Sequence, residues 1–238
     1  MKLTRRLLAL LLTCSLCACA GSDDEDSGLT AADQAKAEKL LADYEAARSL
    51  ENWIGAETKA DQLNSRFADS EAAGKLKSSL PQVRAKAEQE RETRRLADLW
   101  TYQEVAVEDG TQRSASIFSK TVEADEGSVA PVPDAQLVLR DHPAWGRSAY
   151  LLLAQSRFEC GNPCTVKIRF VDVAPQTWAA KRADSGKGPA LFIEDEAGFI
   201  AQMEISREVR ITLPEGSGLV PALTFEVDGF DAGRYAKP

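Results

Sequence analysis

Residues 100–118 read WTYQEVAVEDGTQRSASIF, and within them the periodicity of the sequence changes. Before this stretch, apolar side chains recur every three or four residues. From here they alternate with polar ones, first at Trp100, Tyr102, Val105 and Val107 and then at Ala115, Ile117 and Phe118. An Asp-Gly pair at residues 109–110 separates the two runs, which predicts a β-hairpin. The chain is therefore expected to be helical before residue 100 and β-stranded after it.

Residues 29–99 are predicted to form an α-helical unit, because they are rich in Ala, Leu, Glu, Lys and Arg and almost free of Gly and Pro. Thr30, with Asp33 three residues on, is the expected cap of a first helix. Its apolar face would hold Ala37, Leu40, Leu41, Tyr44 and Ala47. A second helix is predicted over about residues 51–67 and a third from Asp69 or Ser70. The buried side of the second helix would hold Trp53, Ile54, Ala60 and Leu63.

Pro81 interrupts the third helix. Either this helix kinks there, or Ser79 caps a new helix with Gln82 at its third position. The residues that follow, up to Trp100, are heavily charged and are expected to face solvent.

Residues 63–73, LNSRFADSEAA, resemble the junction between tetratricopeptide-like helices in some envelope lipoproteins. Ala68 stands where that junction often has proline, and only about one and a half repeats fit before the strands begin, fewer than a solenoid needs. The sequence therefore predicts a helical hairpin or a three-helix unit. This unit would either bind a peptide in a groove or pack against the next domain.

Residues 100–238 are predicted to form an antiparallel β-sandwich or open barrel of about seven short strands. Beyond the hairpin, strands are expected near residues 135–140, 148–155, 166–170, 209–213 and 223–227. One short helix is predicted from Asp195 to Glu204, with Phe199, Ile200 and Met203 turned inward. The fold class is therefore α+β.

Five segments of this part form a combined pattern: Trp100-x-Tyr102 and residues 114–119, 137–140, 157–160 and 166–170. The pattern is similar to that of small periplasmic β-sandwich proteins of the invasion-associated protein B type, over residues 100–230. This resemblance implies a periplasmic β-sandwich and supplies no catalytic residue.

The N-terminal residues have a basic start at residues 2–6, an apolar run over residues 7–12, and a small residue before Cys19. They resemble the lipobox of bacterial prolipoproteins, which implies that residues 1–18 are a signal peptide and that Cys19 is lipidated. About ten apolar residues are too few for a spanning helix, which needs about 20. Cys14 and Cys17 compete as the lipid site, but neither follows a small residue of the preferred kind.

In lipoproteins of this type an aspartate after the lipidated cysteine favours the inner membrane, and here that position holds Ala20. We therefore expect attachment to the outer membrane, on its periplasmic face. Residues 19–28, CAGSDDEDSG, are polar and acidic and are expected to form a disordered tether.

Loss of residues 1–18 would remove three basic and no acidic residues, leaving 26 basic against 37 acidic side chains and a formal charge of −11. Nucleic acids and anionic lipid surfaces bind clustered Lys and Arg. The expected partners are therefore the membrane, through the lipid on Cys19, and another envelope protein, with no nucleic acid.

Cys160 and Cys164 are expected to form a disulfide that fixes a Gly-Asn-Pro turn in an oxidising compartment. For so small a loop the chain-entropy model gives about 2 kcal/mol. A redox pair usually has two intervening residues and begins a helix. A zinc site would need two more ligands, and the chain has one histidine. We expect no metal and no cofactor.

His142 lies between predicted strands beside Asp141, and no serine or cysteine occupies a recognisable nucleophile context. We therefore assign it to loop packing or solvent, with catalysis or metal binding as the alternative. Residues 185–189, SGKGP, lack the spacing of a phosphate-binding loop and are interpreted as a turn. Trp145 and Trp178 are interpreted as buried core residues, with an aromatic contact surface as the alternative.

These observations favour a non-catalytic lipoprotein that binds or scaffolds another envelope component. The alternatives are a small-ligand or enzyme-inhibitor binding module and a peptidoglycan or glycan hydrolase. No catalytic residue is predicted.

We predict that Cys19→Ala abolishes both palmitate incorporation and membrane attachment, because the thiol of Cys19 is the expected acceptor of the lipid. Metabolic labelling and fractionation of cells measure both. Cys14→Ala and Cys17→Ala are the matched controls and should leave labelling intact. If a control variant lost labelling while Cys19→Ala kept it, the lipid would have to be assigned to the cysteine replaced in that control.

Overall fold

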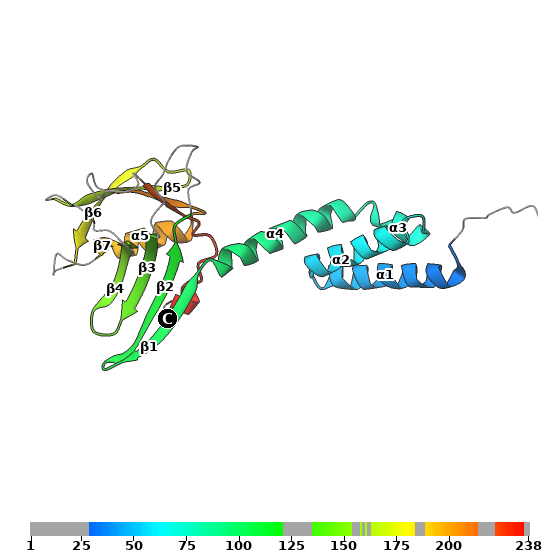
Figure 1. Ribbon diagram of the computed structural model, residues 1–238, viewed down its shortest axis with the longest axis horizontal. Coiled ribbons are helices and arrows are strands. Elements are labelled where there is room, and N and C mark those ends of the chain that lie inside the picture. Colours follow the sequence, from blue (N-terminus) through cyan, green and yellow to red (C-terminus); the bar gives the residue numbers. More distant parts are fainter. Residues whose placement is uncertain are drawn as a thin grey trace, which may run out of the picture.

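The computed structural model describes residues 29–120, 135–153, 158, 160, 163–183, 189–213 and 222–235. N-terminal helices are followed by a curled, antiparallel sheet of nine strands and by short helices, which confirms the predicted α+β class. The molecule is elongated: a helical unit lies at one end, the β domain at the other, and helix α4 connects them (Figure 1).

The helical part consists of α1 (Ala31–Ser49), α2 (Trp53–Arg66), α3 (Glu71–Leu76) and α4 (Leu80–Asp98). The predicted cap is confirmed, since Thr30 Oγ1 accepts a hydrogen bond from the Asp33 N–H at 3.1 Å. Asn52 and Ser70 cap α2 and α3 in the same way. Each cap satisfies a backbone donor that the first helical turn leaves unpaired.

The core of the helical unit is made largely of small side chains, which allow α1, α2 and α3 to approach closely. Its buried residues are Ala37, Tyr44, Ala56, Ala60, Leu63, Phe67, Ala72, Ala73, Leu76 and Val83. The chain breaks before Pro81, and α4 is a new helix. Ser79 occupies its N-cap position without capping it. Its hydroxyl lies 2.6 Å from the Tyr44 hydroxyl instead, so the predicted cap is wrong and Ser79 joins α4 to α1.

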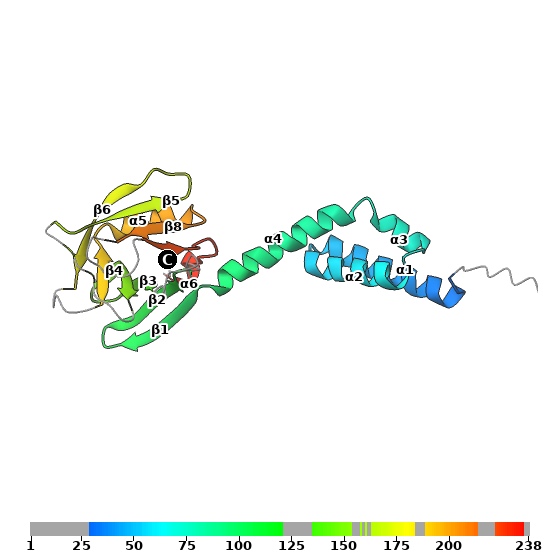
Figure 2. The same ribbon diagram turned by 45° about the horizontal axis from the view of Figure 1, so that its top comes forward.

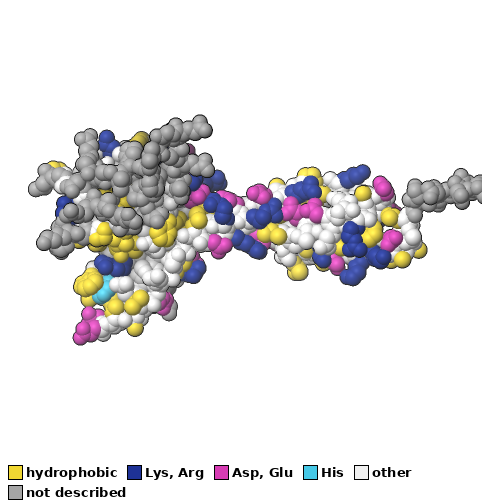
Figure 3. All heavy atoms as spheres, in the orientation of Figure 1, with side chains coloured by type: hydrophobic (Ala, Val, Ile, Leu, Met, Phe, Trp, Pro, Cys, Tyr) yellow, Lys and Arg dark blue, Asp and Glu magenta, His cyan; other side chains and the backbone are white. Residues whose placement is uncertain are grey.

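The second half of α4 leaves the helical unit and runs to the β domain (Figures 1 and 2). Its surface carries interspersed acidic and basic side chains, visible along the connecting helix in Figure 3. Arg91 pairs with Glu88 and with Glu57 of α2, and Arg94 pairs with Glu90. The predicted solvated, charged face is confirmed. A helix of this length spans about 28 Å.

The sheet is antiparallel throughout, in the order β1-β2-β3-β4-β7-β6-β5-β8-β9. Its strands are β1 (Thr101–Val107), β2 (Gly110–Phe118), β3 (Ala135–His142), β4 (Gly146–Leu153), β5 (Thr165–Phe170), β6 (Gln176–Arg182), β7 (Ala190–Ile193), β8 (Val209–Thr212) and β9 (Ala222–Phe225). The predicted hairpin of β1 and β2 is confirmed, with Val107 paired to Gly110. Strands β6 and β7 were not predicted: β6 carries polar residues and alanines in place of alternation, and β7 has only four residues.

The sheet curls until its two ends approach each other. Just beyond β2, the Lys120 N–H donates to the Thr224 carbonyl of β9 at 2.7 Å. Of the two architectures predicted, the open barrel is therefore closer than the sandwich.

Helix α5 (Glu196–Glu204) fills the concave side of the curled sheet (Figure 2). Asp195 caps it, and Phe199 and Met203 are buried, as predicted. The Phe199 ring centroid lies 5.8 Å from that of Phe170 and 6.3 Å from that of Trp178. Helix α6 (Ala232–Tyr235) follows β9 and buries Tyr235.

We call the contact between the end of α4 (residues 95–100) and the segment after β9 (residues 226–231) the joint. Trp100 is buried there, and its indole Nε1–H donates to the Val227 carbonyl at 3.3 Å. Arg95 binds the carboxylate of Glu226 through two hydrogen bonds, at 2.9 and 3.2 Å. The Arg95 guanidinium holds the pKa of Glu226 below its usual value. The two units are thus connected by more than the chain itself.

Gly229 makes the closest contact in the joint. Its φ of +106° lies in the region that favours glycine. A Cβ at this position would stand 2.6 Å from the Leu96 carbonyl carbon and 2.7 Å from the Ala97 nitrogen. Because these are backbone atoms of a helix, they cannot move aside as a side chain could.

We predict that Gly229→Ala lowers the free energy of unfolding by about 2–4 kcal/mol, since it adds both backbone strain and a backbone clash. Urea unfolding followed by tryptophan fluorescence measures the loss. The matched control is Gly146→Ala, where φ is +71° but a Cβ would meet no atom within 4 Å. That variant should lose only the strain, about 1 kcal/mol. Equal losses in the two variants would contradict a tight joint.

Candidate functional site

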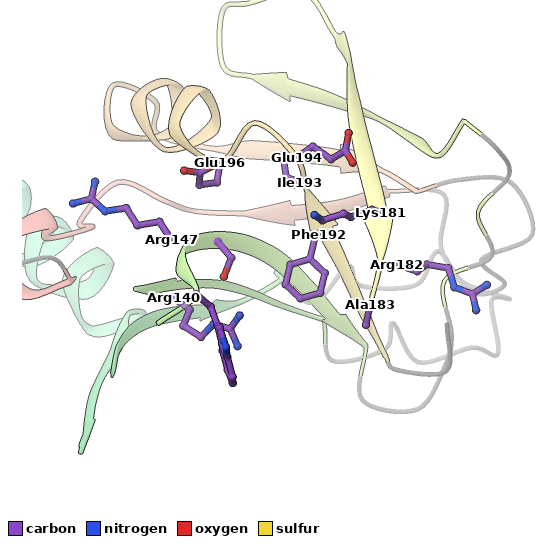
Figure 4. Close-up of a pocket in the computed structure, with 11 residues that line it drawn as sticks. Arg140, Arg147, Lys181, Arg182, Ala183, Phe192, Ile193, Glu194 and Glu196 are labelled. Atoms are coloured by element: carbon purple, nitrogen blue, oxygen red, sulfur yellow. The ribbon is translucent and has the colours of Figure 1, made fainter. Parts of the chain in front are cut away.

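A pocket of about 490 Å³ opens on the sheet where β4 begins and β7 ends (Figure 4). Strands β3, β4, β6 and β7 and the start of α5 contribute its walls. The residues that line it are Arg140, Trp145, Arg147, Ser148, Lys181, Arg182, Ala183, Phe192, Ile193, Glu194 and Glu196. Four of these eleven side chains are basic and two are acidic.

Strand register brings the central residues of the pocket together. Arg140 of β3 is paired with Ser148 of β4, and Phe192 of β7 is paired with Lys181 of β6. Successive side chains of a strand point to opposite faces. These four therefore lie on the face opposite the buried Leu139 and Ala149, outside the barrel core.

Arg140 is the most unusual residue of the pocket. Its Cζ lies 5.4 Å from the centroid of the Trp145 ring and 5.6 Å from that of Tyr150. Its Nε is buried without a hydrogen-bond partner among the described residues, and so is the hydroxyl oxygen of Ser148. Buried donors without partners are rare in folded proteins, and each one requires an explanation. Here both belong to side chains that line one pocket.

Trp145 stands at the turn between β3 and β4 and is 70% exposed, so its interpretation as a core residue is wrong. The physical reason is that His142 occupies the buried position: it is 7% exposed and stacks on Trp145 with centroids 3.9 Å apart. The Ala144 N–H donates to His142 Nδ1 at 3.1 Å. His142 is the last residue of β3 and holds the turn, consistent with a packing role. Trp178 lies on β6 and is partly buried against the core, so its prediction as a core residue is confirmed in part.

The charged side chains around the pocket differ in direction. In Figure 4, Lys181 and Phe192 lie together near its centre, while Arg147 and Arg182 extend to opposite sides. Glu194 and Glu196 border it, yet neither forms an ion pair with a cation among the described residues. The pocket therefore combines N–H donors with aromatic rings, as small-molecule binding sites do.

Cys160 and Cys164 are joined by a disulfide, with Cα atoms 5.2 Å apart. This geometry is compatible with the predicted bridge. The Cys164 carbonyl accepts a hydrogen bond from the Ala180 N–H at 3.0 Å, which fixes the bridge next to β6. A second hollow beside the disulfide shares Lys181, Arg182 and Glu194 with the pocket.

Several predicted features lie outside the described residues: the signal peptide, Cys19 and the tether over residues 1–28, and residues 185–188 of the Gly-rich turn. Across the described part of the chain, no helix is long and apolar enough to cross a membrane. Nor do three or more His, Cys, Asp or Glu side chains gather there in a metal-binding arrangement.

Neither a protein-family model nor a curated protein sequence matches the chain. One solved structure is weakly similar. It is the crystal structure of invasion associated protein B from Bartonella henselae, with a TM-score of 0.35 and 14% sequence identity. The match covers 56% of this chain and 85% of that one. The resemblance expected from the strand pattern is thus present at a coarse level, and it carries no inference about activity.

The sequence did not single out the residues of this pocket, except Trp145. Arg140, Ser148 and Lys181 are ordinary outward-facing residues of their strands. Only the cross-strand register, which a single sequence does not reveal, brings them together.

Tyr235 of α6 lies close enough to charged residues of the pocket, among them Arg140 and Arg147, for these charges to affect its pKa. Its side chain is buried, and its hydroxyl has no partner among the described residues. Burial, helped by the negative charge of Asp141, raises the pKa of Tyr235 to about 12. The neutral phenol is therefore strongly favoured in the folded protein.

We predict that Tyr235→Phe makes the free energy of unfolding depend less on pH in the alkaline range. Between about pH 10 and about pH 12 the tyrosine ionises more readily in the unfolded state than in the folded one, so the stability of the wild type falls by about 2–3 kcal/mol over this interval. At neutral pH the variant should be as stable as the wild type or more so, because it removes an unpaired buried hydroxyl. Urea unfolding at about pH 8 and about pH 11.5 compares the two proteins. A constant difference between them at both pH values would contradict the prediction.

Proposed function

We propose that this chain is a lipoprotein of the outer membrane, anchored through Cys19, facing the periplasm and acting without catalysis. It would bind or scaffold another envelope component. The observation that supports this most directly is the arrangement of two units at opposite ends of α4, connected by the joint (Figure 1).

The position of α1 gives this arrangement a direction. Helix α1 begins at the end of the helical unit that lies away from the β domain (Figure 1). A lipid on Cys19 would therefore place the helical unit next to the membrane and the β domain farther into the periplasm. Since α4 alone spans about 28 Å, the β domain would stand clear of the lipid surface.

The hairpin of β1 and β2 is the surface we favour for contact with a protein partner. It projects from the body of the β domain (Figure 1). Strand β1 lies at an end of the sheet, and most of its side chains are exposed, including Val105 at 48%. Exposed edge strands have unpaired backbone donors and acceptors that a partner strand can use.

A small-ligand binding module is the second candidate. The specific observation in its favour is the pocket around Arg140, with its two unpaired donors and its exposed Trp145. The two candidates are compatible, because the pocket and the hairpin involve different surfaces.

Site-specific photocrosslinking in cells tests the scaffolding proposal. A photoreactive amino acid at Val105 of the full chain should yield one adduct of defined mass that contains an envelope protein. The same substitution at Leu50, an exposed residue at the end of α1, is the matched control. Cys19→Ala should remove both membrane attachment and the adduct. The absence of an adduct at Val105 would contradict contact through the hairpin, and an equal adduct at Leu50 would show that the contact is not specific to it.

A further inference from the structure

We propose that the pocket between β3, β4, β6 and β7 binds a small ligand that carries an oxyanion, a carboxylate or a phosphate, on a planar ring. This inference does not depend on the scaffolding proposal, because it concerns a different surface and a different class of partner.

The unpaired donors of the pocket are the first argument. Arg140 Nε and the Ser148 hydroxyl are both buried, and neither has a partner among the described residues. Leaving a buried donor unpaired costs about 1–3 kcal/mol, and more for a charged group. A ligand oxygen that reaches either group, as its side chain turns toward the pocket, would remove part of this cost.

The stacking of Arg140 shows how it would present its donors. Trp145 and Tyr150 lie within 5.6 Å of its Cζ, at distances typical of rings that contact the face of a guanidinium. Stacking leaves the N–H groups in the guanidinium plane available. Their fork matches the spacing of the oxygens of carboxylate and phosphate groups.

Lys181 adds a second positive charge. It has no ion pair with an acidic side chain of the described chain, although Glu194 borders the same pocket. Arg140 and Lys181 come from strands on either side of β4 and β7. An anion between them would be attracted from both sides, and Glu194 and Glu196 at the border of the pocket would oppose this attraction in part.

The exposed side chain of Trp145 is the reason for expecting a planar ring on the ligand. An indole that is 70% exposed at the mouth of a pocket is an apolar surface without a partner in the described chain beyond His142 and Arg140. Phe192 provides a second ring on the pocket floor, with its centroid 5.0 Å from that of Tyr150. Planar ligands stack favourably on such rings. The volume of about 490 Å³ suits a small molecule.

Isothermal titration calorimetry on the full chain, purified in a non-ionic detergent, tests this inference. Phenyl phosphate and benzoate are the two oxyanion probes, and they distinguish a phosphate site from a carboxylate site. Benzyl alcohol is the ring without the charge, and inorganic phosphate is the anion without the ring. At least one oxyanion probe should bind saturably, and both comparison compounds at least tenfold more weakly.

Variants then assign the binding to the pocket. Arg140→Gln should weaken the preferred probe at least tenfold, and Lys181→Ala at least threefold. Lys167→Ala, an exposed lysine on β5, is the matched control and should leave binding unchanged. Because Arg140 is partly buried and its variant could unfold, Trp145→Ala provides the second test at an exposed position, with a loss of at least threefold expected.

Three results would overturn the inference: no saturable binding of either oxyanion probe, benzyl alcohol binding as tightly as they do, or unchanged affinity in Trp145→Ala and Lys181→Ala. None of them would affect the crosslinking result at Val105, so the failure of one proposal is distinguishable from the failure of the other.

Discussion

The contact of Gly229 with the backbone of α4 is the constraint on which the rest of the structure depends. Without a Cβ, residue 229 lets the segment after β9 lie directly against Leu96 and Ala97. This close approach brings the Val227 carbonyl to the indole of Trp100 and Glu226 to Arg95. The packing of Gly229 on α4 and the hydrogen bond of Trp100 act only at short range. The ion pair of Arg95 with Glu226 favours one orientation of the two units. Together they make one elongated body from two units that the sequence merely places in succession.

The joint also links the two ends of the sheet to the helix. Lys120, just beyond β2, donates its N–H to β9 and forms ion pairs with Glu208 and Glu226. Glu226 therefore receives one cation from α4 and another from the edge of the curled sheet. Exposed ion pairs are individually weak. Here they form a network around a buried tryptophan, and the closure of the sheet and the seating of α4 support each other.

The sequence predicted what local periodicity controls. Thr30 and Asp195 predicted the starts of their helices, and Asp109-Gly110 predicted the hairpin. Alternation identified three further strands, and two more were expected as strand candidates. Each of these signals is contained within a few neighbouring residues. The sequence did not predict β6, β7, the joint or most of the pocket. The joint and the pocket depend on the meeting of residues far apart in the chain, such as Trp100 with Val227 or Arg140 with Lys181. Trp145 was misjudged for a related reason, since composition favours burial of tryptophan and only the turn geometry exposes it.

The charge of the chain and the charge of the pocket act at different ranges. The chain carries a formal charge of −8, which repels large polyanions at distances up to about a Debye length. Arg140 and Lys181 line the same pocket, and the low dielectric near buried atoms strengthens their attraction for a single oxyanion. Added salt would weaken that local attraction and would also screen the general repulsion. The two effects oppose each other, so salt dependence alone is a poor guide to this site, whereas the comparison of charged and uncharged rings depends on the pocket itself.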